Sequence, residues 1–215
     1  MGGAVVPVVI GNTAFLGFPM VLGVFGQSGL LRAIFYDMGT LILFLSLSIL
    51  LIANFGGNIK DVFKRILGFP VLWAFILGIT FNLLNIPIGN IPASIIGYLS
   101  AAAIPIIMIS LGLSLQFKGL KNNLKIAGLD VIVKLVIAPP IIALTIVTLL
   151  GLSNMEFTIA IVEAGMPSGM LTMVLAVTYN LDFGISADCS VVTTVFSLIT
   201  LPILIGTLPF ITGII

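Results

Sequence analysis

Long apolar runs, separated by short breaks rich in polar and turn-forming residues, dominate the pattern of this chain. A helix needs about 20 apolar residues to cross the roughly 30 Å hydrocarbon core of a bilayer. The alternating apolar and polar segments of a transmembrane β-barrel are absent. The pattern therefore predicts an all-α integral membrane protein with seven spanning segments, at 4–26, 30–54, 68–86, 92–115, 124–150, 155–179 and 183–212.

The amino-acid composition excludes several kinds of partner and binding site. Of the 215 residues, 60% are hydrophobic and 7% are charged, whereas a soluble domain carries about 25% charged residues. The net charge is +1 and no basic patch stands out, so no nucleic-acid partner is expected. The chain has no His and a single Cys, Cys189. An imidazole site, an internal disulfide and a CxxC metal site are therefore excluded, and no cofactor is expected.

Basic residues in the breaks orient the chain. They gather in or beside two breaks, 55–67 and 116–123, whereas Arg32 alone falls on the opposite side. Lys and Arg in short loops stay cytoplasmic, so both breaks should face the cytoplasm. Alternation then predicts a multi-pass protein of the plasma membrane with a cytoplasmic N-terminus and an external C-terminus. The residues concerned are Lys60, Lys64, Arg65, Lys118, Lys121 and Lys125.

Two of the predicted helices contain interruptions, at 11–19 (GNTAFLGFP) and 163–169 (EAGMPSG). Pro removes a backbone donor and Gly permits non-helical angles, so both stretches should break the helix. Freed backbone groups persist at membrane depth only where protein buries them or a polar cavity faces them. Ordinary proline kinks are the alternative, but paired interruptions indicate the binding site of a transporter.

The two interrupted segments also resemble each other. Each has a Gly/Pro break, small residues, a short turn, and then a helix with an early Asp (Asp37 or Asp188). Their expected directions across the membrane are opposite. This weak similarity favours an inverted repeat with two discontinuous helices that cross.

Ionisable residues at membrane depth are usually functional. Glu163, four residues before Pro167, is the candidate site for a coupling ion, Na⁺ or a proton. A protonated Glu bonded to a neighbouring helix is the alternative. Asp130 and Lys134 have the i, i+4 spacing of an ion pair on a helix. A structural pair is favoured there over recognition of substrate charge.

Other polar residues are candidates for supporting roles. Asn12 and Thr13 stand on the first interruption, where an amide could hold a carboxylate. Asp37 is expected near a membrane end, where water would solvate it. Hydroxyl groups recur along the last segment beside Asp188, and they could contact a ligand or join helices. These hydroxyl residues are Ser186, Ser190, Thr193, Thr194 and Ser197.

Five stretches, in order along nearly the whole chain, resemble the auxin efflux carrier family. Gly11–Pro19 with Phe25-Gly26 and Gly29-Leu30 is similar to the family's fourth helix, and Ile104-Pro105-Ile106 with Leu111-Gly112 to its seventh. Lys134 with Pro139-Pro140 is similar to the eighth. Ala164–Ser168 with Ala176 and Tyr179 is similar to the ninth, and Thr193–Pro202 to the tenth.

The resemblance implies ten helices in two inverted five-helix repeats, the fold of bile-acid sodium symporters. The chain would start at the fourth helix, with three more expected before it. Residues 1–54 would be the remainder of the first repeat, 55–67 the cytoplasmic loop, and 68–215 the complete second repeat. Carriers of this fold are often homodimers. By position, the crossing residues that would line the substrate site are Asn12, Gly17, Pro19, Met166, Pro167 and Ser168. From the polar pattern described above, Thr13 is added to that site, and the supporting polar residues are Asp130, Lys134, Asp188, Ser190 and Thr194.

The expected function is secondary transport of a small organic anion, such as a carboxylate, by alternating access. A non-transporting membrane fragment or subunit is the alternative. An intramembrane aspartyl protease is remote, because Tyr36-Asp37 lacks the partner Gly-x-Gly-Asp motif. No enzymatic activity is expected, and no metal beyond Na⁺ near Glu163.

Overall fold

The computed structural model describes residues 2–55, 60, 63–64, 67–68, 70–114, 123–150 and 155–212. Arg65, Lys118, Lys121 and the predicted break at 151–154 lie outside these residues. The chain divides into two compact units. Unit 1 comprises Met1–Phe44 and Ile107–Ile215, and unit 2 comprises Leu45–Ile106.

The described residues are overwhelmingly helical, which confirms the predicted all-α class. The helices are α1 (Gly2–Val9), α2 (Phe18–Phe55), α4 (Pro70–Leu83), α5 (Asn90–Ser114), α6 (Leu124–Val131), α7 (Ala138–Leu150), α8 (Met155–Ala164), α9 (Leu171–Thr178) and α10 (Phe183–Thr212). Two π-helical stretches, η1 (Thr13–Gly17) and η2 (Ile132–Ile137), continue into α2 and α7. These bounds follow the predicted segments to within a few residues.

Four described helices are long and apolar enough to cross a membrane by themselves, at Thr13–Phe44, Asn90–Leu113, Leu124–Thr145 and Phe183–Phe210. Seven spans were predicted, and the difference has three causes. The first stretch folds back on itself and counts once. Helix α4 has only 14 residues. The break between α8 and α9 leaves pieces of 10 and 8 residues.

The fold-back within Thr13–Phe44 occurs at Gly26, where the predicted segment 4–26 ends and before the segment 30–54 begins. Gly26 has φ 66° and ψ −163°, values that glycine adopts easily and other residues do not. A Cβ added at Gly29 would lie 3.1 Å from the Val21 side chain. In an unbroken helix these two residues would be about 12 Å apart along the axis. The chain therefore forms a helical hairpin here.

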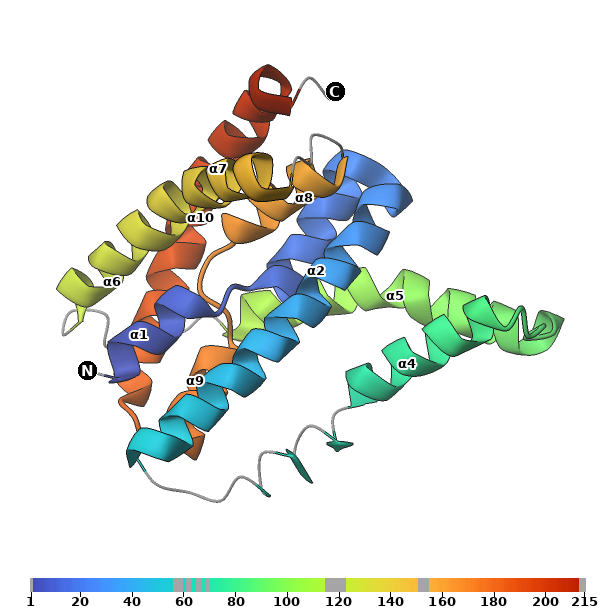
Figure 1. Cartoon of the computed structure of the whole chain (residues 1–215), viewed down its shortest axis with the longest axis horizontal. Helices are drawn as coiled ribbons and strands as arrows, with labels where there is room; N and C mark the ends of the chain where they lie inside the picture. Colours follow the sequence, from blue (N-terminus) through green and yellow to red (C-terminus); the bar gives the residue numbers. More distant parts are fainter. Residues whose placement is uncertain are drawn as a thin grey trace. The chain divides into compact units, whose positions relative to one another are not determined.

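In unit 1, α10 is the central helix, and α1, α6, α8 and α9 all contact it (Figure 1). Helix α7 packs along α8. The buried apolar core includes Leu16, Phe157, Ile161, Met166 and Leu201. These residues come from both interrupted segments and from α10, so the core encloses the interruptions.

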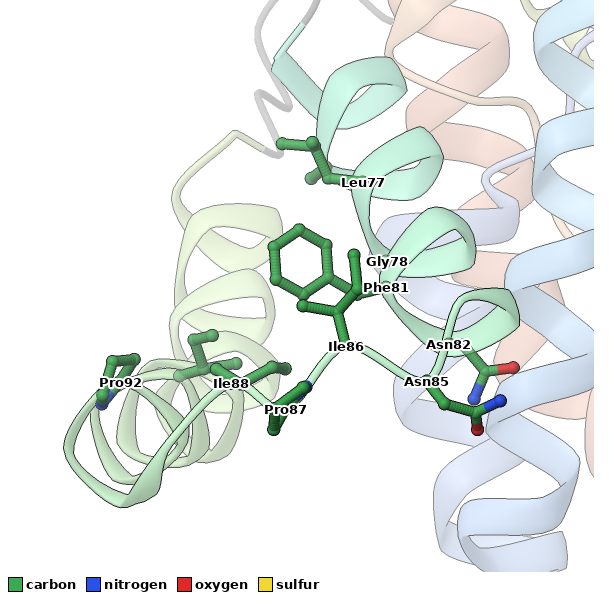
Figure 2. A pocket seen from close by; sticks show the side chains of 11 residues that line it. Leu77, Gly78, Phe81, Asn82, Asn85, Ile86, Pro87, Ile88 and Pro92 are labelled. Carbon is green, nitrogen blue, oxygen red and sulfur yellow. The ribbon is translucent and has the colours of Figure 1, made fainter.

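Unit 2 contains α4 and the first part of α5, joined by a turn in which Asn85 and Gly89 have positive φ values of 50° and 75°. No residue of α4 is buried. A cavity of about 1060 Å³ lies at this turn. Its lining includes apolar side chains such as Phe81 and Ile86 and the amides of Asn82 and Asn85 (Figure 2). Its lining includes no ionisable side chain.

Candidate site where two broken helices cross

The first break lies at residues 10–12, immediately after α1. Asn12 has φ −87° and ψ 53°, outside the helical region. Its carbonyl accepts hydrogen bonds from the N–H groups of both Leu16 and Gly17, at 3.2 and 3.1 Å, which starts the π-helical turn η1. Gly17 and Pro19 therefore belong to the helix that follows the break, and Pro19 is only half-buried. Asn12 and Thr13 lie at the break and are buried.

The second break lies between the end of α8 at Ala164 and the start of α9 at Leu171. The N–H of Gly165 still bonds to the carbonyl of Ile161, and the N–H of Met166 bonds to that of Glu163. Pro167 then ends the ladder, because it has no N–H to donate. The break falls within the predicted 163–169 stretch, and Met166, Pro167 and Ser168 are all buried there.

The two breaks are joined through their backbones (Figure 1). Asn12 N donates to Pro167 O at 2.7 Å, and Gly169 N donates to Ile10 O at 2.9 Å. Gly11 and Ser168 face each other in an isolated antiparallel bridge. Its antiparallel sense agrees with the opposite directions expected for the two segments. These bonds satisfy groups that the helix breaks leave without helical partners.

Gly169 permits this close approach. A Cβ at Gly169 would lie 2.5 Å from Gly11 O and 2.9 Å from its carbonyl carbon. Both atoms are backbone, so they cannot rotate away as a side chain would. Any other residue at position 169 would force the crossing apart.

A group of carboxylates lies beside the first broken helix. Glu163 is 2% exposed, and neither of its carboxylate oxygens has a hydrogen-bond partner among the residues that the structure describes. It sits against the Cα of Gly17, where an added Cβ would be 2.7 Å from Oε1. Asp37 accepts a 2.5 Å bond from the Thr13 hydroxyl. Asp37 and Tyr36 both lie within electrostatic range of Glu163.

Asp37 was expected near a membrane end in contact with water. The structure instead brings it to the crossing, because the hairpin at Gly26 folds α2 back alongside η1. Thr13 and Asp37 are 24 residues apart yet bonded directly. The two carboxylates are therefore parts of one site.

Asp130 and Lys134 lie on another side of the crossing, and both are buried. Lys134 Nζ donates to Val8 O at 2.9 Å, at the end of α1. The Ser168 hydroxyl lies 2.6 Å from Asp130 Oδ2 and 2.9 Å from Pro7 O. Asp130 thus contacts the second break, and Lys134 contacts the end of the helix that precedes the first break.

The expected ion pair between Asp130 and Lys134 is not formed, since the structure records no direct contact between these two described residues within 4.0 Å. The Lys134 ammonium instead donates to the carbonyl of Val8, a partner on another helix. The sequence spacing took no account of such a partner.

The hydroxyl residues of α10 line the same region. Thr193 Oγ1 accepts a 3.0 Å bond from Ser168 N and itself donates to Cys189 O. Asp188 accepts a 2.9 Å bond from the Asn123 amide. Three hydroxyl oxygens of α10, those of Ser186, Ser190 and Thr200, are buried without a hydrogen-bond partner among the described residues. The buried hydroxyl residues are Ser186, Ser190, Thr193, Thr194 and Ser197.

Arg32 alone lies on the side opposite to the other basic residues, although Lys and Arg in short loops usually stay cytoplasmic. The structure supplies a reason. Its Nε lies 2.7 Å from Glu156 Oε1, and the two side chains are 34% and 48% exposed. The pair lines a pocket of about 470 Å³ that also includes Tyr36. Because Glu156 balances the charge, Arg32 adds little net positive charge on its side.

Sequence patterns did not single out Gly169 and Thr193 as crossing residues, or the carbonyl of Val8 as the partner of Lys134. Gly169 could have been found as the glycine after Pro167-Ser168, where two backbones would need to approach closely. The other two contacts depend on tertiary geometry and have no local signal.

The sequence profile of the membrane transport protein family matches residues 3–205. The chain belongs to this family. An uncharacterized transporter of Methanothermobacter thermautotrophicus is 44% identical over 201 residues, which cover 94% of this chain and 66% of the relative. An uncharacterized transporter of Methanocaldococcus jannaschii is 37% identical over 205 residues, with the same coverage of each chain. The chain thus spans less than two thirds of the length of these relatives.

A plant relative confirms the resemblance to auxin efflux carriers. Auxin efflux carrier component 2 of Arabidopsis thaliana is 30% identical over 125 residues, or 55% of this chain and 19% of the relative. No solved structure matches the chain significantly. Family and fold together make this a multi-pass membrane protein of a transport family.

Proposed function

We propose that this chain carries the solute-binding crossing of a secondary transporter for small organic anions. The observation that carries the proposal is the pair of broken helices joined at Asn12–Pro167 and Ile10–Gly169, with the unpartnered Glu163 beside them. Broken helices at membrane depth expose backbone dipoles that can hold ions and charged solutes. The family match supports transport, and the plant relatives named for auxin efflux support an organic solute.

The carboxylate of the solute would bind near the starts of the two half-helices that follow the breaks. The first turn of a helix has N–H groups without intrahelical partners and a partial positive charge. These turns begin at Thr13 and at Leu171, and the Asn12 amide lies beside the first. Lys134 already bonds to Val8 O, so dipoles and amides, rather than this ammonium group, would recognise the solute.

The coupling ion would bind at Glu163 and Asp37. Two carboxyl groups at membrane depth, within electrostatic range of each other, repel when both are ionised. A Na⁺ ion or a shared proton between them would remove that repulsion. Binding of this ion at the crossing would favour binding of the anion, because the cation offsets its charge.

Transport would proceed by alternating access in the plasma membrane, with the N-terminus of this chain cytoplasmic. Since backbone hydrogen bonds join the two breaks, they would move as one body and expose the site to each side in turn. The lipid bilayer is the surrounding partner, and a homodimer is the proposed assembly.

Reconstitution into proteoliposomes tests this function. Uptake of a panel of radiolabelled carboxylic acids is measured with and without a Na⁺ gradient and a pH gradient. We expect saturable uptake of at least one acid that increases with one of the two gradients. Glu163→Gln should abolish that increase, since it removes the ionisable group while keeping its shape.

Glu156→Gln is the matched control, because Glu156 lies on the same helix but is exposed. It should keep the gradient dependence. Gradient-dependent uptake that survives Glu163→Gln would contradict the ion site, and no uptake of any acid would contradict the transport proposal itself.

A further inference from the structure

Lys134 occupies an unusual position for a lysine inside a membrane protein. Its side chain is 5% exposed, and its ammonium lies 2.9 Å from Val8 O. Val8 belongs to the last turn of α1, which is a helix C-terminus with partial negative charge. A Cβ at Gly11 would lie 3.8 Å from the same Nζ. The ammonium is thus held against the backbone of the first break.

The groups around this ammonium are oxygen ligands. Val8 O contacts it directly, and the Asp130 carboxylate acts on it electrostatically. Oδ1 of Asp130 is buried, and no described residue gives it a hydrogen bond. The Ser168 hydroxyl joins Asp130 Oδ2 to Pro7 O, the carbonyl next to Val8 O. A carboxylate, a hydroxyl and the carbonyls of an unwound helix end are the groups that hold small hard cations in proteins.

We propose that Lys134 is a built-in cation, whose ammonium fills a cation site formed by the end of α1, Asp130 and Ser168. The side chain takes the place that a bound Na⁺ would otherwise need to occupy. The negative end of α1 is then neutralised permanently, whatever ions surround the protein. This inference rests on the crossing described under the proposed function, and it leaves the Glu163 side as the only side that takes up a coupling ion.

Removing the side chain should convert the built-in cation into a sodium requirement. Lys134→Ala would leave the oxygen ligands in place and open space for an ion and water. The test is made in the Glu163→Gln background, so that Na⁺ binding at Glu163 adds no response. Heat stability is read as the temperature at which half of the detergent-solubilised protein loses its monodisperse peak on size-exclusion chromatography.

Lys134→Ala/Glu163→Gln should be less heat-stable than Glu163→Gln alone in choline chloride. Replacing choline by 300 mM Na⁺ should raise its midpoint by about 4–8 °C, for an ion that binds at about 10 mM. The Glu163→Gln parent should not respond. Adding Asp130→Asn should remove the response, because it removes the anionic ligand of the vacated site.

Two outcomes would overturn the inference: a Lys134→Ala/Glu163→Gln protein that does not respond to Na⁺, or a response that persists with Asp130→Asn. Lys134→Met keeps the length of the side chain without its charge, and serves if the alanine variant cannot be purified. It should lose heat stability in either salt, whereas stability equal to that of the parent would show that no cation is needed. All these readings concern stability, so they stand apart from the transport assay that tests the proposed function.

Discussion

Substitution of Gly169 by alanine is the most direct perturbation of the crossing. The added Cβ would lie 2.5 Å from Gly11 O and 2.9 Å from its carbonyl carbon, whereas non-bonded heavy atoms prefer about 3.5–4.0 Å. The two backbones would have to separate by about 1 Å. The bonds Asn12 N–Pro167 O and Gly169 N–Ile10 O, now 2.7 and 2.9 Å, would stretch beyond the range of a hydrogen bond.

The cost follows from those two bonds. A buried polar group left without its partner costs about 1–3 kcal/mol, so losing both bonds should reduce the free energy of unfolding by about 2–6 kcal/mol. For a chain of this size each kcal/mol lowers Tm by about 2–4 °C. We therefore expect Gly169→Ala to lower Tm by about 4–24 °C.

Unfolding can be followed through a cysteine of the chain itself, and a second glycine of the bridge provides the control substitution. Cys189 is the only cysteine and is fully buried, so a maleimide dye that fluoresces on reaction reports its exposure during heating. Gly11→Ala is the matched control on the opposite strand of the bridge. Its Cβ would meet only side-chain atoms, at 3.4 Å and beyond, and Tm should change by no more than about 3 °C. Equal Tm values for Gly169→Ala and the unmodified protein would refute the close approach of the two backbones.

Three further substitutions test the surroundings of the crossing. Gly17→Ala places a methyl group against the Glu163 carboxylate, so the half-saturating concentration of the coupling ion in the uptake assay should rise at least tenfold; an unchanged value would contradict the contact. Thr13→Val removes the hydroxyl that donates to the Asp37 carboxylate, and it should lower the free energy of unfolding by about 1–2 kcal/mol. A chemical-denaturation curve measured in detergent would detect this loss. A double-mutant cycle of Arg32→Gln and Glu156→Gln should give a coupling energy of about 0.2–1 kcal/mol, as for exposed ion pairs; a value above about 2 kcal/mol would mean that the pair is shielded from water.

The helices could be predicted because hydropathy and backbone-breaking residues act locally. The apolar length that a bilayer demands set the predicted ranges, and Gly26, Pro167 and Gly169 mark real turns and breaks in the structure. The breaks could be paired in advance only as a hypothesis. Their hydrogen bonds join Ile10 and Asn12 to residues more than 150 positions away.

The partners of the charged residues could not be predicted, because they depend on features with no local signature. Lys134, which lies within the π-helix η2, bonds to the carbonyl of Val8, 126 residues away in sequence. The hairpin at Gly26 brings Asp37 to Thr13. Sequence spacing predicts neighbours within one regular helix, whereas both of these contacts join residues that are far apart in the sequence. The inverted repeat and the division at 55–67 remain predictions.

The bridge between Gly11 and Ser168 is made of main-chain atoms, and this has an evolutionary consequence. Main-chain donors and acceptors are the same in every residue except proline, so most substitutions on either strand leave the hydrogen bonds of the bridge intact. The side chains around the bridge can then change during evolution to bind a different solute, while the bridge itself stays the same. Only the position of Gly169 is tightly constrained, because there the missing side chain is itself the structural requirement.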